Sequence, residues 1–288
     1  MAVLPRAVDS PSEVIKMTKK SEWAKLEKSN FAWTVAFYRE GCGYCALLRP
    51  EFDEAAADLK RYARIGAIDV ERSRDLASYV QQRYGFQVEG VPTIKTFVPR
   101  QHGGGKDKKP LIDTYNGERK AKPIVDAMRA IMPSFLLSQK QMKVLGALEP
   151  GPLAVFFTEK TSTPALTKAL SSKFRERLRV GQMRTGAMAG RGNDWAEKCG
   201  VESPGACILY IGDSEDDAAA EGERAVHVVA GYGRKLSILS LDNWMMDYVP
   251  KSKGGMGKAE RAMKKKMGAK QEESGGEEEA DAMDDHDL

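Results

Sequence analysis

Two cysteines, Cys42 and Cys45, are separated by only two residues in the sequence CGYC. At this spacing two thiols can close a disulfide and open it again, or they can supply half of a zinc site. A zinc site normally needs a second close pair of ligands, and Cys199 and Cys207 are too far apart for the usual short knuckle. The pair therefore predicts dithiol redox chemistry, with no metal. The chain's histidines are also scattered: His102, His227 and His286.

The residues around the pair predict a strand that leads into a helix. Residues 34–38 form a β-rich run, and after the pair apolar residues recur every three or four positions. Cys42 therefore falls where the helix begins, and there the unpaired N–H groups and the positive dipole end lower the pKa of a thiol. We expect Cys42 to be the attacking thiolate and Cys45, one turn further in, to be the buried resolving thiol. The recurring apolar residues are Leu48, Phe52, Ala55, Leu59 and Tyr62.

A second informative stretch covers residues 84–95, where Val91-Pro92 precedes an apolar run. A cis X–Pro peptide bond is only about 0.5–1 kcal/mol less stable than the trans form, so a proline at this position invites one. Taken alone, Pro92 fits an ordinary trans proline at the start of a strand equally well.

Together these residues resemble the thioredoxin superfamily and, within it, the catalytic a-type domain of the protein disulfide isomerase family. The resemblance covers about residues 9–133, with several motifs in the family's order. Besides the Cys42 pair, the matching segments are Val14-Ile15-Lys16-Met17-Thr18, Phe37-Tyr38, Pro50, Gly66-Ala67-Ile68-Asp69, Tyr84-Gly85, Val91-Pro92-Thr93-Ile94 and Tyr115-Asn116-Gly117.

The resemblance implies a role for each site residue. Cys42 would form the mixed disulfide with a substrate, and Cys45 would resolve it. Pro92 would be the cis-proline facing the pair, and Val91 before it would offer backbone hydrogen bonds to an extended substrate. Arg119 falls where the family places an arginine that swings toward the second cysteine and tunes its pKa, although a solvated loop charge is an equal alternative.

Three positions depart from the family pattern. Gly41 replaces the usual Trp before the first cysteine, and Tyr44 replaces the usual His between the cysteines. Ala36 stands where the family often has a buried acid that handles the second cysteine's proton. A His beside the thiolate destabilises the disulfide, so its loss predicts a slower and more reducing centre. Reduction or isomerisation of substrate disulfides therefore fits better than bulk oxidation.

Residues 134–250 read as a second copy of the first half, because Phe156-Phe157 matches Phe37-Tyr38. On that match the two cysteine positions fall on Thr161 and Pro164, so this copy cannot do dithiol chemistry. It resembles the family's non-catalytic b-type domain. The predicted fold class is α/β, with two tandem thioredoxin-like domains (9–133 and 134–250), each a central mixed sheet flanked by helices, plus a disordered tail over 251–288.

The other two cysteines lie in the second half. Cys199 ends a helical stretch and Cys207 lies on an apolar strand, and in both places a free Cys behaves as a small buried hydrophobe. The sequence favours free, inert thiols at both positions. A structural disulfide between them is the alternative, and it requires an oxidising compartment.

The C-terminal segment is basic over 251–270 and acidic over 271–288. Opposed charge blocks with few apolar anchors predict disorder. The alternative is a basic amphipathic helix, because Met256, Ala259, Met263 and Met267 follow a helical spacing. The net charge of +4 is too small to indicate a nucleic-acid partner.

The predicted localisation of the protein depends mainly on the family resemblance. No run approaches the roughly 18 apolar residues of a membrane span, and residues 1–6 contain no signal-peptide core. The last four residues, DHDL, only loosely resemble a retrieval signal. The resemblance points to the endoplasmic reticulum lumen, with the cytoplasm as the alternative.

The predicted activity is that of a protein disulfide isomerase-like thiol-disulfide oxidoreductase with no cofactor. Its substrates would be unfolded or misbonded proteins, met by the surface around Gly43, Tyr44 and Pro92, and glutathione or a redox partner protein would recycle the pair. One alternative is a chaperone or scaffold that holds clients through its second domain, with the pair as a weak or sensory redox site. Another is a cytosolic thioredoxin-like reductase.

Overall fold

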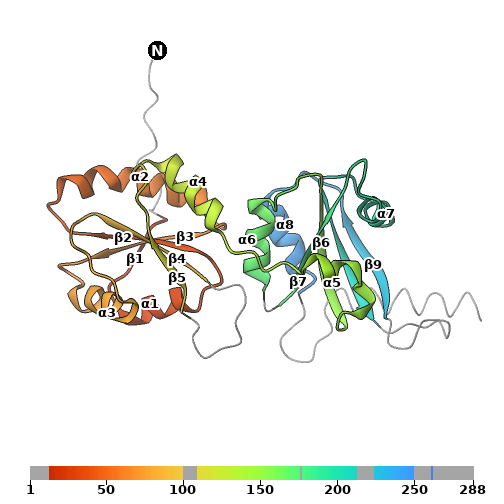
Figure 1. Ribbon diagram of the computed structural model, residues 1–288, viewed down its shortest axis with the longest axis horizontal. Coiled ribbons are helices and arrows are strands. Elements are labelled where there is room, and N and C mark those ends of the chain that lie inside the picture. Colours follow the sequence, from red (N-terminus) through yellow and green to blue (C-terminus); the bar gives the residue numbers. More distant parts are fainter. Residues whose placement is uncertain (1–12, 100–108, 176, 213–223, 250–260, 262–288) are drawn as a thin grey trace, which may run out of the picture. The chain divides into compact units, whose positions relative to one another are not determined.

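The computed structural model describes residues 13–99, 109–175, 177–212 and 224–249, together with Arg261 (Figure 1). By its internal contacts the chain divides into two compact units. One unit contains Met1–Phe135 and Ala165–Lys173, and the other contains Leu136–Pro164 and Phe174–Leu288.

The first unit contains a mixed sheet with the strand order β1-β3-β2-β4-β5. Strands β1, β3 and β2 run parallel, whereas β4 pairs antiparallel with β2, and β5 pairs antiparallel with β4. The strands are β1 (Ile15–Lys16), β2 (Trp33–Tyr38), β3 (Arg64–Asp69), β4 (Thr93–Val98) and β5 (Leu111–Thr114), and the helices are α1 (Lys20–Glu27), α2 (Gly43–Leu59), α3 (Arg74–Tyr84) and α4 (Ala121–Ile131).

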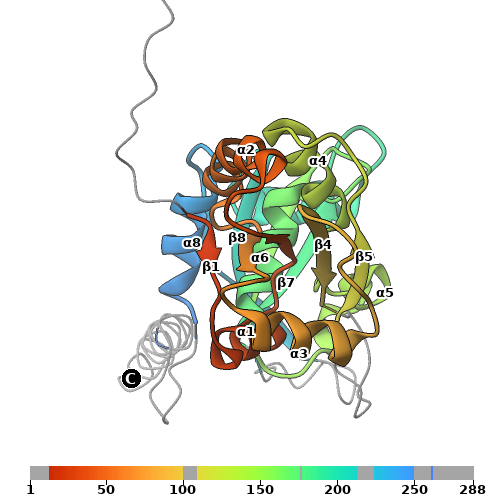
Figure 2. The ribbon, with the colours of Figure 1, turned by 90° about the vertical axis from the view of Figure 1, so that its left-hand side faces the viewer.

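Helices cover both faces of this sheet because successive residues of the central strand β2 point to opposite sides. Val35 and Phe37 belong to an apolar cluster with α1 and α3, whereas Ala36 belongs to a cluster with α2 and α4 (Figure 1). The core is therefore split into two halves by the sheet, and β2 lies between them. Figure 2 shows the same unit from its side, with α2 and α4 on one face and α1 and α3 on the other.

Helix α2 follows β2 directly and contains Pro50, as the sequence predicts. The helix ends at Leu59, so Tyr62 of the expected apolar pattern lies beyond it. Lys60 leaves the helical conformation (ψ 124°) and Arg61 adopts a positive φ of 75°. Tyr62 nevertheless packs against the same cluster as α2.

The second sheet has the strand order β7-β6-β8-β9. Strand β6 pairs parallel with β7 and antiparallel with β8, so the arrangement repeats the centre of the first sheet. The expected α/β class with two mixed sheets flanked by helices is confirmed. The strands are β6 (Gly151–Thr158), β7 (Arg179–Arg184), β8 (Gly205–Gly212) and β9 (Ala225–Tyr232), and the helices are α5 (Gln139–Lys143), the 3-10 helix η1 (Leu145–Ala147), α6 (Ala165–Phe174), α7 (Arg191–Lys198) and α8 (Ile238–Met246).

The prediction of free thiols at Cys199 and Cys207 is wrong, because the structure joins them in a disulfide. Cys199 caps the C-terminus of α7 and Cys207 lies in β8, and their Cα atoms are 6.1 Å apart, within the usual range for a disulfide. Both side chains are buried in one apolar cluster of the second sheet. The approach of the helix end to the strand is a tertiary contact, and the sequence pattern does not reveal it.

Several sequence predictions concern residues outside the described part of the chain. They include His102, the charged segment 251–288 apart from Arg261, and the final DHDL. Within the described residues, no helix combines the length and apolar character that crossing a membrane requires.

Candidate functional site

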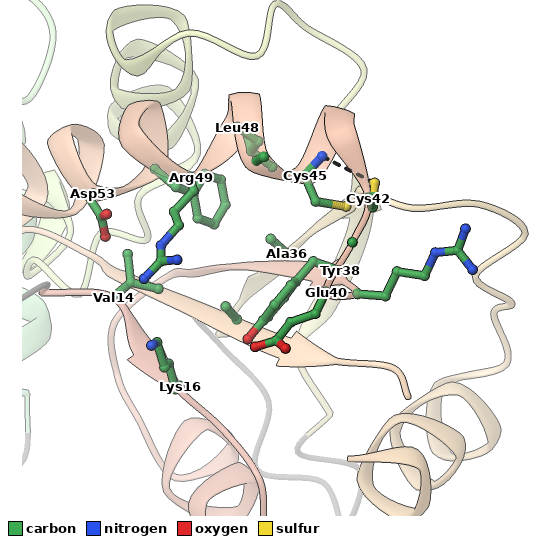
Figure 3. A pocket seen from close by; sticks show the side chains of 15 residues that line it. Val14, Lys16, Ala36, Tyr38, Glu40, Cys42, Cys45, Leu48, Arg49 and Asp53 are labelled. Atoms are coloured by element: carbon green, nitrogen blue, oxygen red, sulfur yellow. Dashed lines mark hydrogen bonds between the residues drawn. The ribbon is translucent and has the colours of Figure 1, made fainter. Parts of the chain in front are cut away.

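The site forms where β2 ends and α2 begins, and both cysteines of the pair are free thiols there. Cys42 is the N-cap of α2, and its sulfur accepts a hydrogen bond from the backbone N–H of Cys45 (N···S 3.2 Å; Figure 3). Cys42 is partly exposed, whereas Cys45 is only 8% exposed. The structure therefore presents one thiol of the pair to solvent and keeps the other behind it.

The environment pushes the pKa values of the two thiols in opposite directions. A hydrogen bond from the Cys45 thiol is the largest cause that lowers the pKa of Cys42, and the backbone N–H groups of Cys45 and Tyr44 and the charge of Arg39 also lower it. Burial raises the pKa of Cys45, and its hydrogen bond to Cys42 raises it further. Between these two pKa values, Cys42 is a thiolate and Cys45 keeps its proton.

The segment before β4 lies against Cys42. The Cys42 thiol donates a hydrogen bond to the carbonyl oxygen of Val91 (S···O 3.6 Å), and the Val91–Pro92 peptide bond is cis. The guanidinium of Arg119 donates to the carbonyl oxygen of Pro92 (3.2 Å). The structure thus places Val91 against the Cys42 thiol and Arg119 against the Pro92 carbonyl, and it gives Arg119 a backbone partner rather than leaving it as a purely solvated charge.

Glycine at position 41 has a conformational reason. Gly41 has a φ of +77°, in the left-handed region that disfavours residues with a Cβ atom. The chain therefore makes a tight turn immediately before Cys42. This local conformation accounts for the absence of a large side chain at a position where the family usually has Trp.

The exposed face of the first turns of α2 carries two large apolar side chains. Tyr44 is 72% exposed and Leu47 is 71% exposed, next to the exposed thiol and Gly43. The sequence points to Tyr44 because it replaces the family's usual His between the cysteines, but it does not point to Leu47. The helical periodicity places Leu47 outside the buried stripe that contains Leu48, so the sequence does indicate that Leu47 is exposed.

Two ion pairs join the loop between β2 and Cys42 to another segment of the chain. The sequence does not predict them. Arg39 pairs with Glu71 (3.5 Å), and Glu40 pairs with Arg72. Both partners come from the segment after β3. The four side chains are more than half exposed, so each pair contributes little stability by itself.

A cavity of about 350 Å³ lies beside the cysteines on the α2 side of the sheet (Figure 3). Ala36 lines it, as does Ala67, its partner in the β2–β3 register. Alanine at position 36 therefore leaves open space near Cys45 where the family often has a carboxylate.

The corresponding junction after β6 carries no thiol. Thr161 is exposed between β6 and α6, and Pro164 is the N-cap of α6. The helix thus begins at the position matched to the second cysteine, whereas α2 begins at the first. This junction offers neither a nucleophile nor a resolving group.

Comparisons with known proteins agree with this geometry. The Thioredoxin family model matches residues 13–130. A protein disulfide-isomerase candidate of Dictyostelium discoideum is 32% identical over 176 residues, which are 60% of this chain and 41% of that protein. Human protein disulfide-isomerase A6 is 35% identical over 118 residues, which are 41% of this chain and 24% of that protein. The chain therefore spans less than half the length of these curated relatives.

Among solved structures, the crystal structure of ERdj5 form II covers 82% of this chain and 30% of that chain, with 16% sequence identity and a TM-score of 0.44. A likeness at this level carries no inference about function.

Proposed function

The chain belongs to the protein disulfide isomerase family of the thioredoxin superfamily, and from this premise we propose that it is a thiol-disulfide oxidoreductase that reduces or rearranges disulfides in folding proteins. The proposal rests on the difference in exposure and pKa between the two thiols. Cys42 is partly exposed with a lowered pKa, and Cys45 beside it is buried with a raised pKa.

The first step is attack by the Cys42 thiolate on a substrate disulfide. One new S–S bond forms between Cys42 and a substrate sulfur, and the other substrate sulfur leaves as a thiolate. The N–H groups at the start of α2 stabilise the attacking anion, because they point at the Cys42 sulfur without requiring water to reorganise.

The second step decides between reduction and rearrangement. If Cys45 loses its proton and attacks Cys42, the substrate leaves with its thiol reduced and the Cys42–Cys45 disulfide forms. If another substrate thiolate attacks first, the substrate leaves with a new disulfide and the pair stays reduced. The raised pKa of Cys45 slows the first route and so favours rearrangement.

We assign substrate contact to the surface around Cys42. Gly43 and Tyr44 lie beside the thiol on α2, Val91 and Pro92 lie across from it, and Arg119 holds the Pro92 carbonyl. A substrate chain in extended form would meet apolar surface from Tyr44 and backbone groups from Val91. Glutathione or a partner protein would return the oxidised pair to the dithiol.

We place the protein in the endoplasmic reticulum lumen. The Cys199–Cys207 disulfide supports this assignment, because disulfides persist in oxidising compartments and are rare in the cytosol of most organisms. Trapping thiols with an alkylating agent in intact cells tests the assignment. If Cys199 and Cys207 are free thiols in cells, the protein resides in the cytoplasm instead.

Recovery of activity by a scrambled, disulfide-bonded client tests the enzymatic proposal. Wild-type protein should accelerate the recovery, and Cys42→Ser should reduce the rate to that of buffer. The matched control is Thr161→Ser, which makes a comparable change at the silent junction and should leave the rate unchanged. An active Cys42→Ser protein would overturn the proposal.

A client-holding role is a second candidate, and a feature of the second unit favours it. A cavity of about 640 Å³ is lined by Met142, Met183 and the fully exposed Met188, and methionine side chains adapt to varied apolar partners. Suppression of client aggregation with both cysteines of the pair alkylated tests this role. Protection that survives alkylation supports holding, and protection that disappears with alkylation contradicts it.

A further inference from the structure

The cavity beside the cysteine pair has an apolar interior. Its lining includes Ala36 and Ala67 from the sheet, Leu48 and Phe52 from α2, and Val14 immediately before β1 (Figure 3). Cys42 and Cys45 lie at one end. Two small side chains in register on neighbouring strands create the space, since any larger residue at either position would fill it.

Two cations lie at the edge of this cavity without a hydrogen-bond or salt-bridge partner among the described residues. Lys16 comes from β1 and Arg49 from α2, and both are exposed. Figure 3 shows Arg49 reaching from α2 toward Val14 and Lys16. The two positive groups therefore approach the same end of the cavity from opposite walls.

The remaining charged groups of the lining leave a net positive charge there. Arg39 and Glu40 are each engaged in the ion pairs of the loop before Cys42, with Glu71 and Arg72. Asp53 is the other carboxylate of the lining, and its charge offsets one of the two positive charges in the sum over the lining. One positive charge remains, which matches a monoanion.

The hydroxyl of Tyr38 is a further polar group of the lining. Burial raises the pKa of Tyr38, so the phenol keeps its proton at neutral pH and can donate a hydrogen bond.

The volume limits the size of an occupant. Since liquid water gives each molecule about 30 Å³, the cavity of about 350 Å³ holds roughly a dozen non-hydrogen atoms. This suits a small organic molecule and is too small for a folded peptide segment. Apolar walls with a few polar groups at one edge are the usual composition of a small-molecule site.

We propose that this cavity binds a small organic monocarboxylate with a compact apolar body. The body lies against Ala36 and Ala67, and the carboxylate lies between Lys16 and Arg49. Cys45 lines the same cavity, so the bound acid covers the resolving thiol and slows its reactions. The slower reaction of Cys45 as a resolving thiol rests on the proposed redox function, whereas binding of the acid does not.

Calorimetric titration of the full chain with 3-phenylpropanoate, which has eleven non-hydrogen atoms, tests the binding. The neutral amide of the same acid is the control ligand and should bind more weakly, by a factor of up to about five, which is the upper effect of one exposed charge contact. The double variant Lys16→Gln/Arg49→Gln should lose affinity for the acid by a similar factor. Lys25→Gln/Lys28→Gln removes the same charge from α1 and its C-cap, outside the cavity lining, and should leave affinity unchanged.

Protection of Cys45 from alkylation locates the bound acid. In a Cys42→Ser background Cys45 is the only free thiol, because Cys199 and Cys207 are paired. The acid should slow alkylation of Cys45 by iodoacetamide, and Ala67→Leu, which fills the cavity, should remove both binding and protection.

Three results would overturn the proposal: no measurable binding, equal affinity for the acid and its amide, or binding without protection of Cys45. If Ala67→Leu does not fold, the double variant Lys16→Gln/Arg49→Gln and its control still show whether the acid binds in this cavity. Because binding is measured without turnover, a failure of this proposal is separable from a failure of the redox function.

Discussion

The two strand-to-helix junctions of this chain, β2 to α2 and β6 to α6, share an architecture but not a chemistry. Each strand is flanked by a parallel and an antiparallel neighbour. The first junction places a thiol at the helix N-cap, whereas the second places Pro164 there. The fold therefore supplies the location, and the residues at the helix start decide whether it reacts.

The cysteines of the two units differ in the same way. Cys42 and Cys45 are free thiols at a surface junction, whereas Cys199 and Cys207 are joined inside an apolar cluster. One pair is arranged to change its bonding during a reaction, and the other is arranged to keep it. Substitutions at the two pairs should therefore have different consequences.

Cys45→Ser should convert the first junction from a catalyst into a trap. Cys42 can still attack a substrate disulfide, but no neighbouring thiol can release the product, so mixed disulfides accumulate. Non-reducing gel electrophoresis with a disulfide-bonded client should show the covalent complex, and reduction of the client should stop. A Cys45→Ser protein that reduces client disulfides at the wild-type rate contradicts the assigned roles.

Cys199→Ser/Cys207→Ser should destabilise the second unit and spare the first. For a sequence separation of 8 residues, chain entropy gives a loss of about 2.5 kcal/mol in the free energy of unfolding. Urea unfolding followed separately for each unit by hydrogen exchange measures this loss. The folded variant should still reduce the client at the wild-type rate. A loss of activity would show that the two cysteine pairs are coupled.

Gly41→Ala should cost about 1–2 kcal/mol of stability in the first unit, because residue 41 has a φ of +77°. A Cβ atom at this position would have no neighbour within 4 Å, so the cost comes from the backbone alone. Gly43→Ala is the matched control: its Cβ would also meet open space, but its φ is not in the left-handed region. Equal stability of the two variants would contradict this explanation of Gly41.

The pH dependence of alkylation should separate the two thiols. Because the pKa of Cys42 is lowered and that of Cys45 is raised, Cys42 should react at a pH where Cys45 is still protonated. Reactivity of Cys42 is then present above its lowered pKa and is lost as the pH falls through that value. Arg39→Gln should raise the Cys42 midpoint slightly, since Arg39 is a minor cause of the shift.

Mass spectrometry after timed exposure to iodoacetamide gives the two profiles separately. Midpoints in the reverse order, with Cys45 titrating first, would contradict the assignment of the nucleophile. A midpoint for Cys42 that does not respond to Arg39→Gln would remove Arg39 from the list of causes.

The local features of the site follow from the sequence because they depend on neighbours along the chain. The β-rich run predicts β2, the apolar periodicity predicts α2, and together they place Cys42 at the helix start. Tyr62 departs from the prediction because Lys60 ends the helix before the apolar pattern ends.

The features that the sequence does not reveal depend on segments that are distant in the chain. The Cys199–Cys207 disulfide needs the end of α7 to meet β8, and the cavity needs Ala36 and Ala67 to be partners in adjacent strands. The ion pair between Arg39 and Glu71 likewise joins two separate loops. Spacing and periodicity carry no information about such contacts.

The reduction potential of the Cys42–Cys45 pair is the decisive measurement for the proposed role as a disulfide reductase or isomerase. The purified chain is equilibrated in graded glutathione buffers, and the Cys42–Cys45 disulfide is quantified by alkylation and mass. With Tyr44 in place of the family's His, we predict a value between about −270 mV, as in thioredoxin, and about −180 mV, as in protein disulfide isomerase. A value near −120 mV, roughly that of a strong oxidant, or the absence of any Cys42–Cys45 disulfide across the series would contradict the account.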